Sequence, residues 1–225
     1  MSEMSVSAAA QHLKVTPRQV TRLASSGELT VTRRVGGALL LDGASVHRRA
    51  HARPARGRPA TPAGAWAALA MLSGETADWL DPAALSRLRT RLRRSCAEDV
   101  AWMVRRRSLR IERMQGWGDA TGLIPTGASV LTEPYWSDYF ELSAVDRGTH
   151  DGYVPQKKYA ATIRDLGLIE DPEGDFTIRV VPASAGWPVD RVLPAAVAVD
   201  LMESLDTREA AAGNLALTRM LGRIL

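Results

Sequence analysis

The chain has 225 residues, enough for two small domains, and its 45% hydrophobic and 24% charged residues are ordinary for a globular protein. No apolar run reaches the roughly 18 residues of a membrane span, and the start Met1–Met4 lacks the charged and apolar regions of a secretory signal. The single cysteine, Cys96, excludes an internal disulfide framework, and the four histidines are not spaced as metal ligands, so we expect a cytoplasmic protein with no membrane partner, metal or cofactor.

The net charge of +4 is unevenly distributed along the chain. Residues 1–59 hold ten Lys/Arg against three Asp/Glu, a net charge of +7, whereas the other 166 residues carry 19 basic against 22 acidic side chains, a net charge of −3. A basic segment on a slightly acidic body is expected where one module meets a polyanion.

Two helices are predicted within residues 5–46. The apolar residues of the stretch 6–13 recur at helical spacing, which indicates a first helix. After a short turn, Thr16 is placed to cap a second helix, Pro17 occupies its first position, and Gly27 ends it. The side chains expected to face the first helix are Val15, Val20 and Leu23.

A basic hairpin follows the two helices. Residues 29–35 and 38–41 predict two strands, which join through Gly36-Gly37, a pair able to adopt positive φ. Arg33 and Arg34 therefore lie near the tip of the hairpin. Together with the helices this forms a predicted winged helix-turn-helix, in which the second helix enters the major groove and the wing arginines neutralise phosphates.

The candidate DNA-binding residues divide by expected role. Arginine and glutamine side chains in the first turns of the second helix can bond base edges, which gives Arg18, Gln19 and Arg22. Positions expected to contact phosphates are Thr21, Arg33 and Arg34. Thr16, which caps the second helix, is also included among the DNA-binding residues, and two linker positions, Arg56 and Arg58, add salt-dependent affinity.

Residues 51–64 are rich in Pro, Gly and Arg and lack periodicity, which predicts a linker that is not helical. It separates a DNA-binding domain, residues 1–50, from a second domain, residues 65–225. Within it, Arg56–Pro59 is similar to the core of an AT-hook, which lies in the narrow minor groove of A·T tracts. An ordinary basic linker is the alternative interpretation.

The second domain is predicted to contain both helices and strands. Period-two alternation or an apolar run preceded by a turn predicts strands at 109–114 and 176–181. Helical patterns cover 65–72, a segment opened by Asp81-Pro82, 159–169, and much of the last forty residues. We therefore expect a mainly α fold with small β-hairpins, of the α+β class: an N-terminal winged helix-turn-helix plus a C-terminal α+β domain.

Charge also varies within this domain. Residues 87–113 contain ten arginines and three acids, a net charge of +7, whereas residues 114–225 contain nine basic and sixteen acidic side chains. The arginines are interpreted as a solvated helix face, with a surface for DNA or an acidic protein partner as the alternative. The sequence shows none of the phosphate-binding, nucleophile-elbow or zinc-protease motifs, so we expect no enzyme activity.

Two family resemblances follow from these residues. The first fifth of the chain resembles the excisionase and MerR-type winged helix-turn-helix, through Val6–Ala10, Leu13, Val15-Thr16, Val20, Leu23, Ser26–Leu29 and Val35–Gly37. Most of the chain resembles the actinobacterial AbiEi-like type IV antitoxins, through Arg56–Pro59, Ala65-Trp66, Leu85–Arg89, Pro125–Ser129, Asp151–Val154 and Asp200–Glu209.

The second resemblance implies a function. In AbiEi-like antitoxins the N-terminal domain binds operator repeats and represses its own operon, and the C-terminal domain counters a nucleotidyltransferase-like toxin. We therefore expect an autoregulating repressor whose partners are double-stranded operator DNA, a nucleotidyltransferase-like toxin and, if it dimerises, a second copy of the chain. Two alternatives are a phage-type regulator with a ligand- or partner-binding C-terminal domain and an excisionase-like factor that bends DNA.

Overall fold

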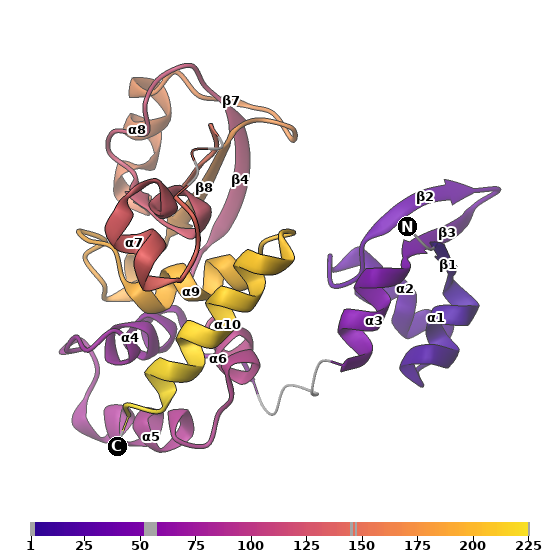
Figure 1. Ribbon diagram of the computed structural model, residues 1–225, viewed down its shortest axis with the longest axis horizontal. Coiled ribbons are helices and arrows are strands. Elements are labelled where there is room, and N and C mark those ends of the chain that lie inside the picture. Colours follow the sequence, from indigo (N-terminus) through magenta and orange to yellow (C-terminus); the bar gives the residue numbers. More distant parts are fainter. Residues whose placement is uncertain (1–2, 52–57, 145, 147, 225) are drawn as a thin grey trace. The chain divides into compact units, whose positions relative to one another are not determined.

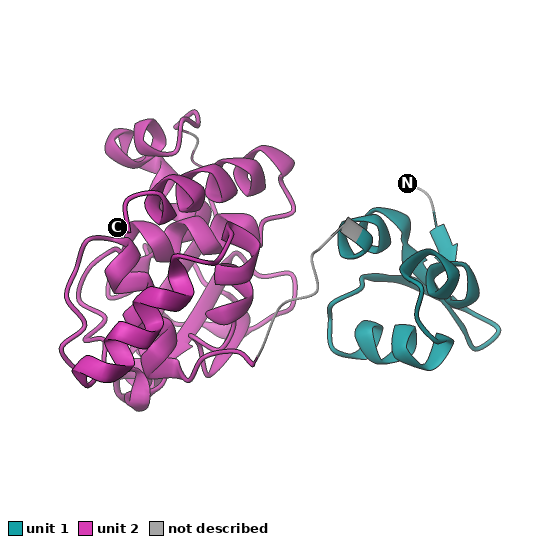
Figure 2. Ribbon diagram, turned by 90° about the horizontal axis from the view of Figure 1, so that it is seen from below, with its two compact units in different colours: residues 1–55 teal, residues 56–225 magenta. Residues whose placement is uncertain are grey.

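The computed structural model describes residues 3–51, 58–144, 146 and 148–224, and it combines α-helices with β-strands in two compact units (Figure 1). Contacts divide the chain into residues 1–55 and residues 56–225 (Figure 2). Each unit has a hydrophobic core of its own. Among the described residues, no helix is long and apolar enough to cross a membrane.

The first unit packs three helices against a small antiparallel sheet with strand order β1-β3-β2. Its elements are β1 (Glu3–Ser5), α1 (Val6–Leu13), α2 (Pro17–Ser25), β2 (Val31–Val35), β3 (Ala38–Asp42) and α3 (Gly43–His51). The core consists of Ala9, Ala10, Val20, Leu23, Leu29, Leu41 and Val46. β1 was not predicted because a strand of three residues is too short to show a pattern. α3 was not predicted because basic side chains interrupt the apolar pattern of its sequence.

Local chemistry explains where these elements begin and end. The Thr16 hydroxyl accepts a hydrogen bond from the Gln19 amide at 3.2 Å, so Thr16 caps α2 as predicted. Gly36 and Gly37 have φ values of 54° and 83°, and the pairing of Val35 with Ala38 closes a two-residue turn between β2 and β3. The prediction for Val15 was wrong: this side chain is 38% exposed instead of packing on α1, because it lies in the turn before the helix.

The second unit surrounds a five-stranded mixed sheet with strand order β5-β6-β8-β4-β7. Its strands are β4 (Arg110–Gln115), β5 (Ile124–Pro125), β6 (His150–Pro155), β7 (Ile169–Glu170) and β8 (Phe176–Val181). β6 and β8 are parallel, and the other neighbouring pairs are antiparallel. Small hairpins were expected here, so the mixed sheet corrects that part of the prediction. β6 was missed because Asp151-Gly152 reads as a turn.

Helices cover this sheet and form most of the core. The α-helices are α4 (Pro62–Leu72), α5 (Pro82–Leu92), α6 (Ala97–Met103), α7 (Pro134–Tyr139), α8 (Tyr159–Asp165), α9 (Pro194–Met202) and α10 (Thr207–Leu221). Short 3-10 turns are η1 (Gly127–Thr132), η2 (Gln156–Lys158) and η3 (Ala183–Ala185). Helices α4 and α9 are apolar on nearly every side and are buried along most of their length, as expected for central helices.

The predicted linker, residues 51–64, overlaps helices at both ends. Helix α3 extends to His51, and α4 begins at Pro62. The Thr61 hydroxyl accepts a hydrogen bond from the Gly64 amide at 3.3 Å, and Pro62 needs no partner at the first helical position. A proline-dense segment therefore opens a helix, contrary to the sequence prediction.

Helices α9 and α10 pack closely at Gly213. A Cβ atom placed there would collide with the Ala198 carbonyl oxygen and lie 3.0 Å from the Leu201 Cβ. Backbone atoms of α9 cannot give way as a flexible side chain can, so the absence of a side chain sets the distance between the two helices.

We expect Gly213→Ala to destabilise the second unit by about 1–3 kcal/mol, because α10 must move away from α9. The free energy of unfolding in urea, followed by tryptophan fluorescence, measures this, since all six tryptophans lie in the second unit. Gly118→Ala is the control, because a Cβ there meets nothing within 4 Å. Equal stability of the two variants would contradict this packing constraint.

Candidate nucleic-acid interface

The exposed side of α2 carries the residues that the sequence selected for base contacts. Val20 and Leu23 are buried against the core of the first unit, which turns the opposite side of the helix outward. Arg18, Thr21 and Arg22 are exposed, and Gln19 is half-buried. The structure thus brings the predicted base-contacting residues together on one surface.

The positive charge of this surface is not neutralised by the residues that the structure describes. Within the part of the chain that the structure describes, Arg18, Arg22 and Arg34 form no ion pair. The first turn of α2 contains no acidic residue, so the partial positive charge of the helix N-terminus adds to that of the arginines.

The two hairpin arginines point to opposite faces of the sheet. Arg34 lies opposite Leu39, whose face includes the buried Leu41, so its side chain is on the side covered by the helices. Arg33 lies opposite Leu40, on the outer face. The sequence treated the two arginines as equivalent, and the pleat of the strand separates them.

Arg33 is held by Glu3 of β1. Its Nε donates to Glu3 Oε1 at 2.9 Å and its Nη2 to Oε2 at 2.8 Å, a forked pair. This hydrogen bonding, with the charge of Arg33, lowers the pKa of the Glu3 carboxyl, so the pair is ionised at neutral pH. Arg33 therefore differs from Arg34, whose guanidinium has no such acidic partner within the described chain.

The other predicted positions are less available. The Thr16 hydroxyl caps α2, and the Thr21 hydroxyl donates to the Pro17 carbonyl at 3.2 Å. Arg56, and with it half of the proposed AT-hook core, lies outside the described residues. Arg58 is exposed but belongs to the second unit, where its carbonyl accepts a hydrogen bond from Arg91 at 3.3 Å.

Sequence reasoning missed a buried charge network in the second unit. Its centre is Asp200 on α9, which is 3% exposed. The Asp200 carboxylate pairs with Arg107 and lies 3.2 Å from Arg179 Nη1, and it accepts hydrogen bonds from Thr126 at 2.5 Å and Tyr153 at 2.8 Å. Both oxygen atoms of the Asp200 carboxylate therefore have hydrogen-bond or ion-pair partners.

Two further carboxylates complete the network. Glu203 accepts hydrogen bonds from Arg107 at 2.8 Å and from Arg179 at 2.9 Å, and Asp151 binds Arg179 through two bonds of 2.8 and 3.0 Å. Burial raises the pKa of Asp151 to about 6 in spite of Arg179. Burial would also raise the pKa of Asp200, but the guanidinium groups of Arg179 and Arg107 and further hydrogen bonds hold it below its usual value.

Two signals in the sequence could have revealed this network. Arg179 is a lone charge in the otherwise apolar run of β8, and Asp200 is a lone carboxylate in α9. Each is costly to bury without a partner, so the two predict one another. Arg107 gave no signal, because it follows two exposed arginines in the same run.

A hollow of about 380 Å³ lies over the network, between the face of the sheet that carries Thr177 and Arg179 and the α9–α10 connection. Its size is within the range of ligand pockets. The charged side chains of the network that line this hollow are paired with one another: Arg179 pairs with Asp151 and with Glu203. No group of three or more His, Cys, Asp or Glu in the described ranges could hold a metal ion.

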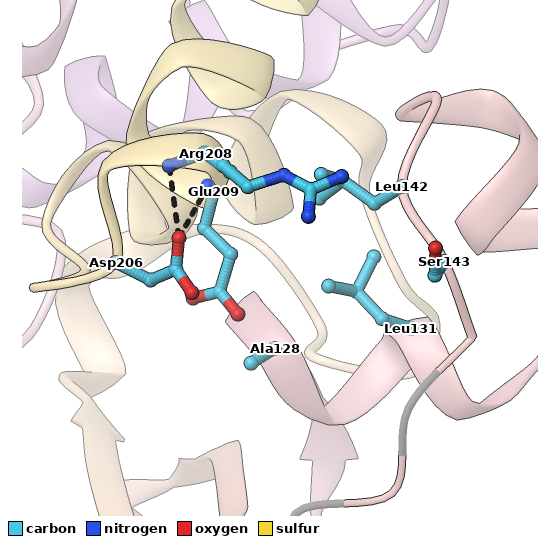
Figure 3. Close-up of a pocket in the computed structure, with 7 residues that line it drawn as sticks. All are labelled: Ala128, Leu131, Leu142, Ser143, Asp206, Arg208 and Glu209. Carbon is cyan, nitrogen blue, oxygen red and sulfur yellow. Dashed lines mark hydrogen bonds between the residues drawn. The ribbon is translucent and has the colours of Figure 1, made fainter.

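A second pocket, of about 70 Å³, lies beside the N-terminus of α10 (Figure 3). Asp206 caps that helix by accepting from the amides of Arg208 at 2.8 Å and Glu209 at 3.4 Å. The Glu209 carboxylate accepts from the Ser204 hydroxyl at 2.5 Å. The Asp206 carboxylate here serves the helix end, and the pocket has room for a few water molecules.

Comparison with known protein families, with curated proteins and with solved structures found no match to this chain.

We expect Asp200→Asn to destabilise the second unit by about 3–5 kcal/mol, because the buried guanidinium groups of Arg107 and Arg179 lose their shared counter-charge. Urea unfolding followed by tryptophan fluorescence measures the change. Asp190→Asn is the matched control, since among the described residues Asp190 pairs only with its exposed neighbour Arg191 at 3.3 Å. This variant should stay within about 0.5 kcal/mol of the parent protein. A loss no larger than the control's would show that the network contributes little.

Proposed function

We propose that the chain is a sequence-specific DNA-binding repressor whose first unit is a winged helix-turn-helix. The observation that carries this proposal is the exposed side of α2, where Arg18, Gln19 and Arg22 gather without an acidic partner among the described residues. In this proposal the N-terminal half of α2 enters the major groove, and the two-residue hairpin turn forms the wing.

The arrangement supports different roles for the side chains. Arg18 and Gln19 lie in the first turn of α2, from which they can reach base edges, and guanidinium and amide groups can bond guanine and adenine in pairs. Arg34 lies on the helix side of the hairpin and is proposed to bind phosphate. Thr16 and Thr21 contribute mainly to the helix itself, since their hydroxyls are engaged there.

We further propose that the protein is an antitoxin that represses its own operon. The resemblance to AbiEi-like antitoxins supports this role, in which the second unit counters a nucleotidyltransferase-like toxin. Residues 114–225 carry sixteen acidic against nine basic side chains, a net negative charge suited to a basic partner. If two copies of the chain pair, the operator consists of repeated half-sites.

The direct test is binding of the protein to the DNA upstream of its own coding sequence, against a scrambled duplex of equal length, at two salt concentrations. Selective binding that survives the higher salt supports the proposal. Equal affinity for both duplexes, lost together as salt rises, would overturn it, since phosphate contacts alone produce that behaviour.

We expect Arg18→Ala and Gln19→Ala to cost about 1–3 kcal/mol of operator binding and to relax sequence preference, because base contacts are lost. Arg34→Ala should instead weaken binding to all duplexes and reduce the slope of log K against log salt by about one. Fluorescence anisotropy titrations over a salt series measure both quantities. A uniform loss for all three variants, with the preference unchanged, would contradict the assigned roles.

We expect Glu3→Gln to increase affinity for every duplex and to steepen the salt dependence by about one, because Arg33 is released to a phosphate. The same titrations measure it. The double variant Glu3→Gln/Arg33→Gln should lose the gain, which links the effect to Arg33. Weaker binding of Glu3→Gln would show that Glu3 positions Arg33 instead of competing for it.

A further inference from the structure

The second unit carries a concentrated arginine surface on α5 and just after α6. We call it the arginine face and define it by its exposed members, which are Arg87, Arg89, Arg93, Arg94, Arg105 and Arg106. Leu85, Leu88 and Leu92 turn the other side of α5 towards the core. Arg87 and Arg89 thus lie on the part of α5 that packing leaves free, and Arg93 and Arg94 follow its last residue, Leu92.

The positive charge of this face is not neutralised within the described chain. None of its six arginines forms an ion pair there, and Arg105 lies over the Trp102 ring at 4.1 Å. The acids of the same segment are engaged elsewhere: Glu98 accepts from Asn214 at 2.7 Å, and Asp99 accepts from the Cys96 amide at 3.3 Å. Arg93 and Arg94 are adjacent, as are Arg105 and Arg106, and like charges at such short separation repel one another, a repulsion that is relieved when an anionic partner binds.

The face lies where the chain enters the second unit. The Arg58 carbonyl accepts from Arg91 on α5, and the Ala60 amide donates to the Met103 carbonyl at the end of α6 at 2.9 Å. Residues 58–60 therefore run between the two parts of the face. Residues 52–57 join this point to the end of α3, so the unit proposed to hold DNA is covalently linked to the unit that carries the arginine face.

The spacing of the charges suits duplex DNA. From Arg87 to Leu92, the last residue of α5, the helix rises about 7.5 Å, and Arg93 and Arg94 follow directly. Each strand of duplex DNA carries about one negative charge per 3.4 Å of the helix axis, so about two phosphates of one strand fall within that length. A flexible guanidinium on each helical turn can follow such a row without reading any base.

We propose that the arginine face is a second, sequence-independent DNA-contact surface, which binds phosphates of the same duplex beyond the segment read by α2. This inference rests on the proposed DNA-binding function and extends it. The face adds affinity and footprint length, while sequence preference stays with α2.

The test compares two full-length variants that each lose four positive charges. One is Arg87→Gln/Arg89→Gln/Arg93→Gln/Arg94→Gln. The matched control is Lys157→Gln/Lys158→Gln/Arg164→Gln/Arg223→Gln, at exposed positions of the same unit outside the face. Urea unfolding followed by tryptophan fluorescence verifies that the second unit is folded. Should the first variant fail to fold, two double variants replace it. One is Arg93→Gln/Arg94→Gln, and the other is Arg105→Gln/Arg106→Gln.

Affinity is measured over a salt series for two duplexes that contain the same upstream DNA. The first has short flanks, and the second is extended on each side by about one helical turn of scrambled sequence. The parent protein and the control should bind the longer duplex more tightly. The arginine-face variant should lose that gain, and its salt slope should fall by about 0.9 for each phosphate contact removed. Its preference for upstream over scrambled DNA should stay unchanged.

Two results would overturn the inference and are separable from failure of the proposed function. If the arginine-face variant matches the control in flank dependence and salt slope, the face does not contact DNA. If it loses sequence preference, the face belongs to base recognition. Failure of the proposed function is a different result: the parent protein itself would then show no preference for its upstream DNA.

Discussion

The second unit depends on one buried carboxylate. Asp200 lies in an apolar helix at the centre of the unit, and an unpaired charge there would cost several kcal/mol. Arg107, Arg179, Thr126 and Tyr153 converge on it from segments far apart in the sequence. Because each of these groups also needs the others, the network fixes where α9 lies on the sheet.

The same network explains why β6 and β8 lie side by side in parallel. Asp151 and Tyr153 on β6 bracket Arg179 on β8, and all three point to the face covered by α9. If β6 slipped by one residue against β8, Asp151 and Tyr153 would turn to the opposite face of the sheet and Arg179 would lose the Asp151 carboxylate. The polar groups thus specify a register that apolar side chains alone would specify more weakly.

Charge is separated between surfaces that have different proposed partners. The exposed side of α2 and the arginine face are basic and lack internal counter-ions within the described chain, whereas residues 114–225 are acidic. In the first unit, Glu3 forms an ion pair with Arg33, so under the proposed function Arg34 is the hairpin arginine that binds a phosphate. Under the proposed function, such local pairing tunes the strength of DNA binding without changing the residues that read sequence.

Local signals determined much of this protein in advance. The cap at Thr16, the turn at Gly36-Gly37 and the strand 176–181 depend on neighbours in the sequence, and each is found as predicted. The mixed α and β class was also predicted. The sequence likewise separated a basic N-terminal segment from a more acidic remainder, since charge can be counted without knowing the fold.

Only the tertiary structure decided the rest, because it depends on residues that are distant in the chain. Nothing in the alternation of Arg33 and Arg34 indicates that Glu3 reaches one of them across β3, and nothing near Arg107 distinguishes it from the exposed Arg105 and Arg106. Partner identity for a charged side chain is set by long-range packing. The sequence by itself therefore predicted which residues bind DNA under the proposed function, and the fold decided which of the described arginines lack an acidic partner.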